Sequence, residues 1–308
     1  MNSDTTAVAG DPVAEIVELD EGVDFADPDI RARMREALEA GNVLFLKGRG
    51  FVLTDRERAI ITDAQVMFRG NEEKCRRNGR PTLTFDVATD RLLFTTIRSP
   101  ERREIEAMLR RYSEWSRDLL QTIVPEFAQT CEQNRIIYRP VERSRTQGMH
   151  IDTTYLYPTQ GRSKLRIFCN IDPKGRPRVW EIGERFETFV QRYLPSVRVE
   201  RSWFETAIDR SASLAGIVKG QRTGFDHVLE KIRELAKKDR DFQKTSPRRI
   251  VSFPPGSAWV ALTDIVLHGG VSGQHALDQV FFLPPKVMHD PARSALGILE
   301  RLSGHSLA

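Results

Sequence analysis

The chain has 308 residues, of which 40% are hydrophobic and 29% charged, a composition typical of a globular protein. No apolar run approaches the roughly 18 residues that a membrane-spanning helix needs. The three cysteines form no CxxC pair, which argues against a disulfide framework and a thiolate zinc site. The first ten residues lack the basic and apolar regions of a secretory signal, so we expect a cytoplasmic protein.

Charge is divided unevenly along the chain. The first 30 residues hold nine acidic and no basic side chains, whereas the remainder holds 47 basic and 34 acidic ones, a formal net charge of +13. Arginines are densest between residues 135 and 178. A basic body favours anionic partners such as nucleic acid, phosphorylated lipid or an acidic sugar, and composition alone does not choose among them.

The N-terminal part is predicted to be mainly helical. Residues 1–29 are expected to form an acidic, flexible segment, and residues 30–308 a single domain. Apolar side chains at helical spacing and start signals such as Ser99-Pro100 identify the helices. Helices are expected over 30–40, 54–67 and 99–127, with short strands at 43–46, 82–85 and 92–94.

After residue 134 the hydrophobic pattern changes to the alternation that is typical of strands. Strands are expected at 135–139, 165–171, 178–181, 249–253, 258–262 and 279–283. A helical insert at about 184–245, with helices over 184–196 and 223–240, interrupts this series.

One His-x-Asp sequence, His150-Ile151-Asp152, stands out among the chain's six histidines. Alternate residues of an extended segment point to the same face, so His150 and Asp152 are expected to lie together. A distal histidine, His268, ends an apolar run that we interpret as a strand, and two glycines follow it. Two histidines and one carboxylate on one face of a metal suit a non-haem Fe(II) site that activates oxygen. A zinc hydrolase is the competing use of the same ligands.

These residues, in a chain of helices followed by strands, resemble the Fe(II)/2-oxoglutarate dioxygenase superfamily. Longer strings around them are similar to the bacterial Kdo 3-hydroxylases, and the resemblance covers most of residues 30–290. Kdo is 3-deoxy-manno-octulosonic acid, the acidic sugar that links lipid A to the rest of lipopolysaccharide. The similar strings are residues 149–153, 170–180, 253–259 and 268–283.

The resemblance implies an α+β fold with a double-stranded β-helix core, a jelly roll like that of cupins, with N-terminal helices and the helical insert around it. It implies hydroxylation of Kdo at C3 in Kdo-lipid A, with Fe(II), 2-oxoglutarate and O2 required and ascorbate as an expected stimulant. The implied metal ligands are His150, Asp152 and His268. The expected partners are Kdo-lipid A and an anionic membrane surface at the inner face of the inner membrane, and not nucleic acid.

The sequence position of the basic residue that would hold 2-oxoglutarate differs from the commonest pattern of the superfamily. Many members place Arg or Lys about ten residues after the distal histidine, but residues 276–279 contain no base. We expect Arg166, on a predicted strand after Asp152, to hold the co-substrate 2-oxoglutarate together with Asn170, which lies on the same face of that strand. An arginine in an apolar strand is costly to bury without an anion. An outward-facing Arg166 is the alternative, with Arg162 or Lys164 then taking the role.

Three arginines close in sequence to the metal motif are expected to bind the Kdo carboxylate, because guanidinium groups recognise planar anions through paired hydrogen bonds. They are Arg143, Arg145 and Arg162. Two other functions stay open at this point. One is a nucleic-acid demethylase of the same superfamily, since aromatic and basic side chains interleave over 135–178. The other is a non-enzymatic metal-binding jelly roll that senses a ligand.

Overall fold

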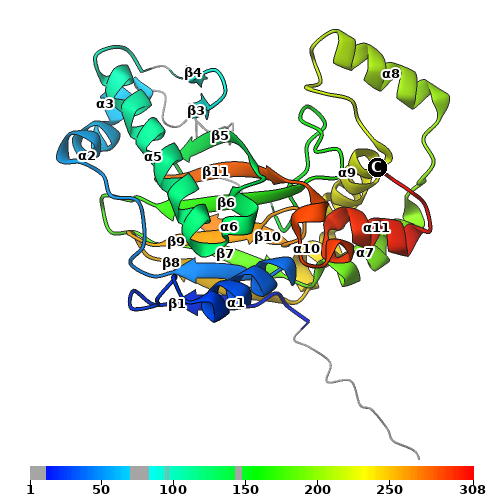
Figure 1. Cartoon of the computed structure of the whole chain (residues 1–308). Helices are drawn as coiled ribbons and strands as arrows, with labels where there is room; N and C mark the ends of the chain where they lie inside the picture. The colour runs from blue at the N-terminus through cyan, green and yellow to red at the C-terminus, as the bar shows by residue number, and fades with distance from the viewer. Residues whose placement is uncertain (1–11, 70–82, 94, 96, 143–147) are drawn as a thin grey trace, which may run out of the picture.

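The computed structural model describes residues 12–69, 83–93, 95, 97–142 and 148–308 (Figure 1). Its centre is formed by two sheets, one of eight strands in the order β1-β2-β9-β6-β11-β5-β3-β4 and one of three in the order β10-β7-β8. All strand pairs are antiparallel except β1 with β2. The larger sheet consists of β1 (Ile16–Leu19), β2 (Val43–Leu46), β3 (Leu83–Asp86), β4 (Arg91–Leu93), β5 (Glu132–Arg139), β6 (Ser163–Asn170), β9 (Ala258–Leu262) and β11 (Ala276–Leu283). The smaller sheet consists of β7 (Arg178–Gly183), β8 (Arg248–Phe253) and β10 (His268–Ser272).

An aromatic cluster joins the inner faces of the two sheets. Trp259 of β9 stacks on Phe168 of β6 and on Phe253 of β8, with ring centroids 5.2 Å and 4.1 Å apart. Trp180 of β7 meets Phe168 edge to face at 4.7 Å. Because these strands belong to both sheets, burial of the aromatic rings holds the sheets face to face.

The N-terminal helices cover the outer face of the larger sheet (Figure 1). They are α1 (Pro28–Glu39), α2 (Asp55–Thr62), α3 (Ala64–Phe68), α5 (Glu101–Ile123) and α6 (Pro125–Ala128). The longest, α5, buries one face of its surface, including Ile105, Met108 and Leu109. Its Tyr112 hydroxyl donates to the Ile167 carbonyl of β6 at 2.9 Å, which fixes the helix on the sheet.

A second group of helices lies between β7 and β8, in the position of the predicted insert. They are α7 (Phe186–Tyr193), α8 (Trp203–Leu214), α9 (Gly224–Lys238) and α10 (Arg240–Thr245), and α11 (Ala295–Ser303) follows β11 near the C-terminus. Three short 3-10 turns complete the helices, at Leu194–Ser196, Pro285–Val287 and Pro291–Arg293. In Figure 1, α7, α9 and α11 gather at the right-hand end of the sheets, and α8 stands away from them.

The strands and helices differ from the predicted pattern in several places. The helix predicted over 99–127 is divided into α5 and α6, and α8 and α11 were not predicted. Residues 16–19, predicted to be flexible, form β1, because Ile16–Leu19 pairs in parallel with Val43–Leu46. Residues 1–11 lie outside the described part of the chain. The helix predicted over 54–67 is divided, since the Asp63 side chain accepts from the Gln65 and Val66 amides and starts a new helix. His268 begins β10 instead of ending a strand, because residues 263–266 form a turn after β9.

Candidate metal centre

Two separate segments place the three predicted ligands together. His150 and His268 form an isolated antiparallel bridge: the His150 amide donates to the His268 carbonyl at 3.0 Å, and the His268 amide donates back at 2.9 Å. The Asp152 amide donates to the Thr263 carbonyl at 2.8 Å. The backbone itself therefore aligns the His-x-Asp segment beside the start of β10.

The side chains of His150, Asp152 and His268 converge on one point. Asp152 Oδ1 lies 3.8 Å from His150 Nε2, and its Oδ2 lies 3.9 Å from His268 Nε2. One ligand atom from each residue lies within 4.8 Å of the others. Ligand bonds of about 2.0–2.2 Å allow one ion to reach all three groups. This two-histidine, one-carboxylate set is the donor arrangement of non-haem Fe(II) oxygenases.

Both imidazoles are oriented by their other ring nitrogen. His150 Nδ1 lies 2.9 Å from the Gly148 carbonyl, and His268 Nδ1 lies 2.9 Å from the Val266 carbonyl. A carbonyl only accepts, so each Nδ1 carries the proton and each Nε2 presents a lone pair toward the centre. Such backbone contacts fix the tautomer that a metal-binding histidine needs.

The protonation states also suit a metal. Burial, followed by the charge of the neighbouring His268, lowers the pKa of His150 to about 3. Burial also lowers the pKa of His268. Burial alone would raise the pKa of the Asp152 carboxyl, but Arg166, His268 and Lys164 hold it well below its usual range. Neutral imidazoles and an ionised carboxylate are the forms that bind a metal, so the site is prepared before an ion arrives.

Arg166 points inward from β6, as predicted, and its side chain is only 7% exposed. Its guanidinium bridges two carboxylates, those of Asp152 and Asp278. Its Nε is buried and has no hydrogen-bond partner among the described residues. An unsatisfied buried donor beside the metal ligands is a place for one more anionic oxygen.

Two further side chains belong to the centre: Asp278, which was not predicted, and Lys164, which was named only as an alternative to Arg166. Asp278 of β11 is 1% exposed and binds both Arg166 and Arg139, the latter at 3.2 Å. Lys164 is buried, and its Nζ donates to the Asp152 carbonyl at 3.2 Å; burial lowers the pKa of this lysine. A single acid on the inward face of an otherwise apolar strand was the signal available for Asp278.

Trp180 of the smaller sheet forms one wall of the centre. Its ring stacks on His268, with centroids 4.9 Å apart and an interplanar angle of 19°. Phe168 lies under the Arg166 guanidinium at 4.9 Å. The aromatic cluster between the sheets therefore continues to the metal ligands and makes their surroundings apolar.

Asn170 lies on the inward face of β6 but is fully occupied elsewhere. Its amide nitrogen donates to the Arg176 and Phe253 carbonyls, both at 2.9 Å, and its oxygen accepts from the Asp172 amide at 3.0 Å. The side chain has no amide hydrogen left for 2-oxoglutarate, so the structure gives Asn170 the role of holding the turn after β6.

Of the three predicted substrate arginines, the structure describes Arg162, whose printed contacts are with residues other than the metal ligands. Arg162 pairs with Glu132, donates to the Thr159 carbonyl at 3.0 Å and lies over the Phe282 ring at 4.8 Å. Arg143 and Arg145 lie outside the described residues, and their assignment stays a prediction.

The family model for 3-deoxy-D-manno-oct-2-ulosonic acid (Kdo) hydroxylase matches residues 23–306. The chain belongs to the Kdo hydroxylase family. None of the curated protein sequences matches it.

Solved structures of another Kdo hydroxylase, KdoO, share the fold of this family member. KdoO is a non-haem Fe(II) α-ketoglutarate-dependent dioxygenase, and its complex with succinate and Fe(III) is 30% identical, with a TM-score of 0.84, over 95% of this chain and 97% of that one. Its complex with α-ketoglutarate and Fe(III) is 29% identical, with a TM-score of 0.84, over 96% and 97%. Its apo structure is 30% identical, with a TM-score of 0.82, over 95% and 97%. The predicted α+β jelly-roll fold and the family resemblance are both confirmed.

Proposed function

We propose that this Kdo hydroxylase family member is an Fe(II)- and 2-oxoglutarate-dependent dioxygenase that hydroxylates Kdo at C3 in Kdo-lipid A. The observation that carries the proposal is the convergence of His150, Asp152 and His268 in a chain that matches the family from residue 23 to residue 306. The overall reaction consumes one O2 and one 2-oxoglutarate. It releases succinate and CO2 and replaces one C–H hydrogen of the sugar by hydroxyl.

The donor set fits iron. His150, Asp152 and His268 would hold Fe(II) through two imidazole nitrogens and one carboxylate oxygen, which leaves coordination positions free for small molecules. The bound iron would supply the redox chemistry between O2, 2-oxoglutarate and the sugar. The protein's own contribution is to fix the tautomers of both histidines, to keep Asp152 ionised and to surround the centre with Trp180 and Phe168.

Arg166 is the residue that we assign to the co-substrate. Its unpartnered Nε and its buried guanidinium support binding of a carboxylate of 2-oxoglutarate. Asp278 of β11 holds the guanidinium and is itself paired with Arg139 of β5. This arrangement would replace the base that many superfamily members carry after the distal histidine.

The membrane context of the substrate is the part of the proposal that rests on charge. Kdo carries a carboxylate and lipid A carries phosphates, and the chain after residue 30 has a formal net charge of +13. No helix in the described part of the chain is long and apolar enough to cross a membrane. We therefore place the protein at the cytoplasmic face of the inner membrane as a peripheral enzyme.

The test is a reaction on purified Kdo-lipid A in detergent micelles with the Fe(II)-loaded protein and 2-oxoglutarate. Mass spectrometry should show a gain of one oxygen on the Kdo residue, together with an equal amount of succinate. Lipid A without Kdo is the matched control and should gain none. Succinate production with an unchanged Kdo-lipid would reject the substrate.

A further inference from the structure

The helix α8 carries its apolar side chains on the outside. Trp203 is 70% exposed, Phe204 60%, Ile208 61% and Leu214 90%, and none of the residues of α8 is buried. At 100° per residue these four side chains lie within an arc of roughly 140°. Ile217, just after the helix, is 61% exposed as well. We call these five side chains the apolar face of α8.

The opposite side of α8 is polar and points toward the protein. Asp209 accepts from the Tyr155 hydroxyl at 2.7 Å and forms ion pairs with Arg201 and Arg222. The Arg222 guanidinium, only 3% exposed, also donates to the Tyr155 carbonyl at 3.2 Å. A helix normally buries its apolar side. Here buried ion pairs hold the polar side, and the apolar side is directed to solvent.

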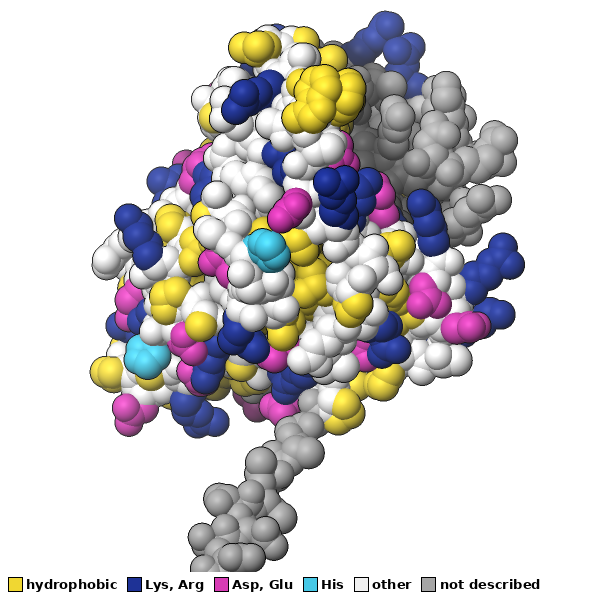
Figure 2. Space-filling model, turned by 90° about the vertical axis from the view of Figure 1, so that its right-hand side faces the viewer, with side chains coloured by type: hydrophobic (Ala, Val, Ile, Leu, Met, Phe, Trp, Pro, Cys, Tyr) yellow, Lys and Arg dark blue, Asp and Glu magenta, His cyan; other side chains and the backbone are white. Residues whose placement is uncertain are grey.

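The helix is well formed in itself. Ser202 and Glu205 make a capping box: the Ser202 hydroxyl accepts from the Glu205 amide at 3.2 Å, and the Glu205 carboxylate accepts from the Ser202 amide at 2.9 Å. Figure 1 shows α8 standing away from the sheets, joined by a connecting segment on each side to the neighbouring helices α7 and α9. Figure 2 views the same side and shows hydrophobic side chains at the top of the molecule with basic side chains near them. The apolar face is thus presented on a projecting segment, residues 197–223, which we call the arm.

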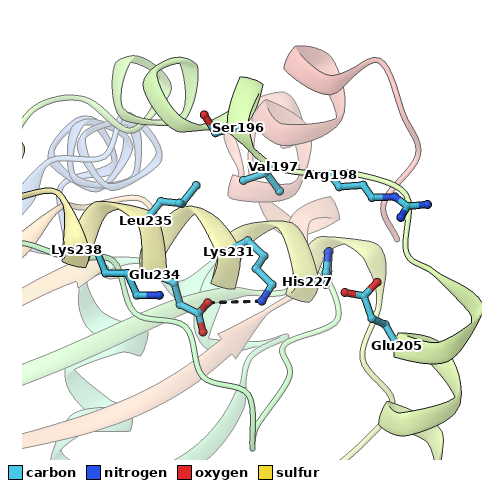
Figure 3. Close-up of a pocket in the computed structure, with 9 residues that line it drawn as sticks. All are labelled: Ser196, Val197, Arg198, Glu205, His227, Lys231, Glu234, Leu235 and Lys238. Atoms are coloured by element: carbon cyan, nitrogen blue, oxygen red, sulfur yellow. Dashed lines mark ion pairs between the residues drawn. The ribbon is translucent and has the colours of Figure 1, made fainter.

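The charges next to the apolar face are positive. Arg210 on α8 and Lys219 after it are exposed, and neither forms an ion pair with an acid among the described residues. By contrast, the pocket of about 200 Å³ between Glu205 of α8 and the helix α9 has mixed charge (Figure 3). There Lys231 pairs with Glu234 at 3.5 Å. The pocket thus holds acids among its bases, whereas Arg210 and Lys219 beside the apolar face have no acidic partner among the described residues.

We propose that the apolar face of α8 docks into an anionic lipid surface, with Arg210 and Lys219 at the headgroups. Exposed Trp and Phe beside basic residues are the pattern of helices that lie in the membrane interface. A symmetric dimer through the same face would bring the like charges of two copies together. This inference rests on the proposed function only for its choice of a lipid surface as the occupant.

The arm is connected to the metal centre by a short stretch of chain. Tyr155, which binds Asp209 of α8, is three residues after the metal-ligand candidate Asp152. The Lys219 amide donates to the Leu156 carbonyl at 2.9 Å, and Leu156 is itself 45% exposed. Docking of α8 would therefore bring the loop that follows the metal motif to the lipid surface, where a lipid-linked sugar is displayed.

The experiment measures binding of the full-length protein to vesicles by co-sedimentation. Phosphatidylglycerol mixed with phosphatidylcholine is the anionic surface, and phosphatidylcholine alone is the neutral one. The triple variant W203A/F204A/I208A should bind anionic vesicles at least about tenfold more weakly than the unmodified protein. The matched control V52A/I250A removes two equally exposed apolar side chains elsewhere, 74% and 60% exposed, and should bind normally.

A charge variant tests the second part of the proposal. R210Q/K219Q should lose about fivefold in affinity per cation at low salt, and the loss should shrink at high salt, where charges are screened. Equal binding of the triple variant and the unmodified protein would overturn the proposal, and so would equal affinity for neutral and anionic vesicles. A dimer that the triple variant dissociates in analytical ultracentrifugation would also overturn it, because a second copy would then cover α8.

Turnover of Kdo-lipid A in detergent micelles separates this proposal from the proposed function. The triple variant should turn over the micellar substrate as fast as the unmodified protein, because α8 contributes none of the metal ligands. If neither protein oxidised the sugar, the proposed function would fail, while the vesicle measurement would still decide the role of α8.

Discussion

Charged side chains usually lie at the surface of a protein and apolar ones in its interior. The metal centre breaks the first half of this rule, and the arm at α8 breaks the second. The centre buries charge: the side chains of Asp152, Arg166 and Asp278 are 17%, 7% and 1% exposed. The arm exposes apolar groups, with Trp203 70% and Leu214 90% exposed. Both arrangements cost stability, because buried ions lose hydration and exposed apolar surface orders water.

The difference lies in what compensates each cost. In the centre, the buried charges neutralise one another within the chain, through Arg166 between its two carboxylates. At α8, no described side chain covers the apolar face. The centre is therefore stable by itself and ready for a metal, whereas the arm is completed only by something outside the chain.

Removal of a metal ligand should have the largest effect. His268→Ala and His150→Ala should each lower turnover by at least about a thousandfold, since several kcal/mol of transition-state stabilisation depend on the metal. The bound iron, measured by elemental analysis after gel filtration, should fall with the activity. His289→Ala, at a histidine that makes no contact with the centre in the structure, is the matched control. A variant of either ligand with full activity would contradict the metal assignment.

Replacement of Arg166 should destabilise the protein, because its guanidinium compensates two buried carboxylates. Arg166→Ala leaves Asp152 and Asp278 with one cation fewer, and we expect the free energy of unfolding to fall by about 3–5 kcal/mol. Where the variant folds, it should need roughly ten- to a hundredfold more 2-oxoglutarate. Arg162→Ala removes a more exposed pair with Glu132 and should cost under about 1 kcal/mol. Equal stability losses in urea denaturation would contradict the account of the centre.

The free energy of unfolding of the metal-free protein should depend on pH because His150 is buried in a neutral form. The pKa of His150 is lowered from 6.5 to about 3, so an unfolded chain takes up this proton at a pH where the folded chain does not. Above about pH 6.5 the residue is neutral in both states and does not change the free energy of unfolding. As the pH drops from 6.5 toward 3, proton uptake by the unfolded chain lowers this free energy progressively. At about pH 5 the loss from this residue should be about 2 kcal/mol. Urea denaturation of metal-free protein at several pH values measures it, and His150→Gln should flatten the curve. An unchanged slope in that variant would contradict the assignment.

The arm should show the smallest effect on stability. W203A/F204A/I208A should change the free energy of unfolding by less than about 0.5 kcal/mol, because these side chains touch little of the folded protein. Phe225→Ala, in the fully buried part of α9, should cost about 3–5 kcal/mol. A large loss in the triple variant would mean that α8 packs on the protein, and it would remove the contrast with the centre.

Much of the fold could be predicted from the sequence because most strands carry their own local signal. The alternation in 165–171 predicted β6, and the His-x-Asp pattern predicted two ligands of the metal centre. β1 was missed, since its four residues lie among acids and are ordered only by pairing with β2. The start of β10 at His268 was also missed, because the apolar residues before it look like a strand but form a turn.

The rest of the centre depends on contacts between distant parts of the chain. Asp278 binds Arg166 across 112 positions of sequence, so no local pattern reports the pair. The Asn170 amide, expected to bind 2-oxoglutarate, instead donates to two backbone carbonyls, one of them 83 positions away. The exposure of the apolar face of α8 is likewise a tertiary property. Sequence shows that a helix has two sides but not which side the protein covers.

The most direct test of the central claim follows the oxygen atom itself. Kdo-lipid A is incubated with the Fe(II)-loaded protein, 2-oxoglutarate and isotopically labelled O2, and the sugar and the succinate are analysed by mass spectrometry. We predict one labelled oxygen in the Kdo residue at C3 and one in succinate for each turnover, and neither with His268→Ala. Label in succinate with an unmodified Kdo residue would contradict the account, as would a hydroxylated sugar without label.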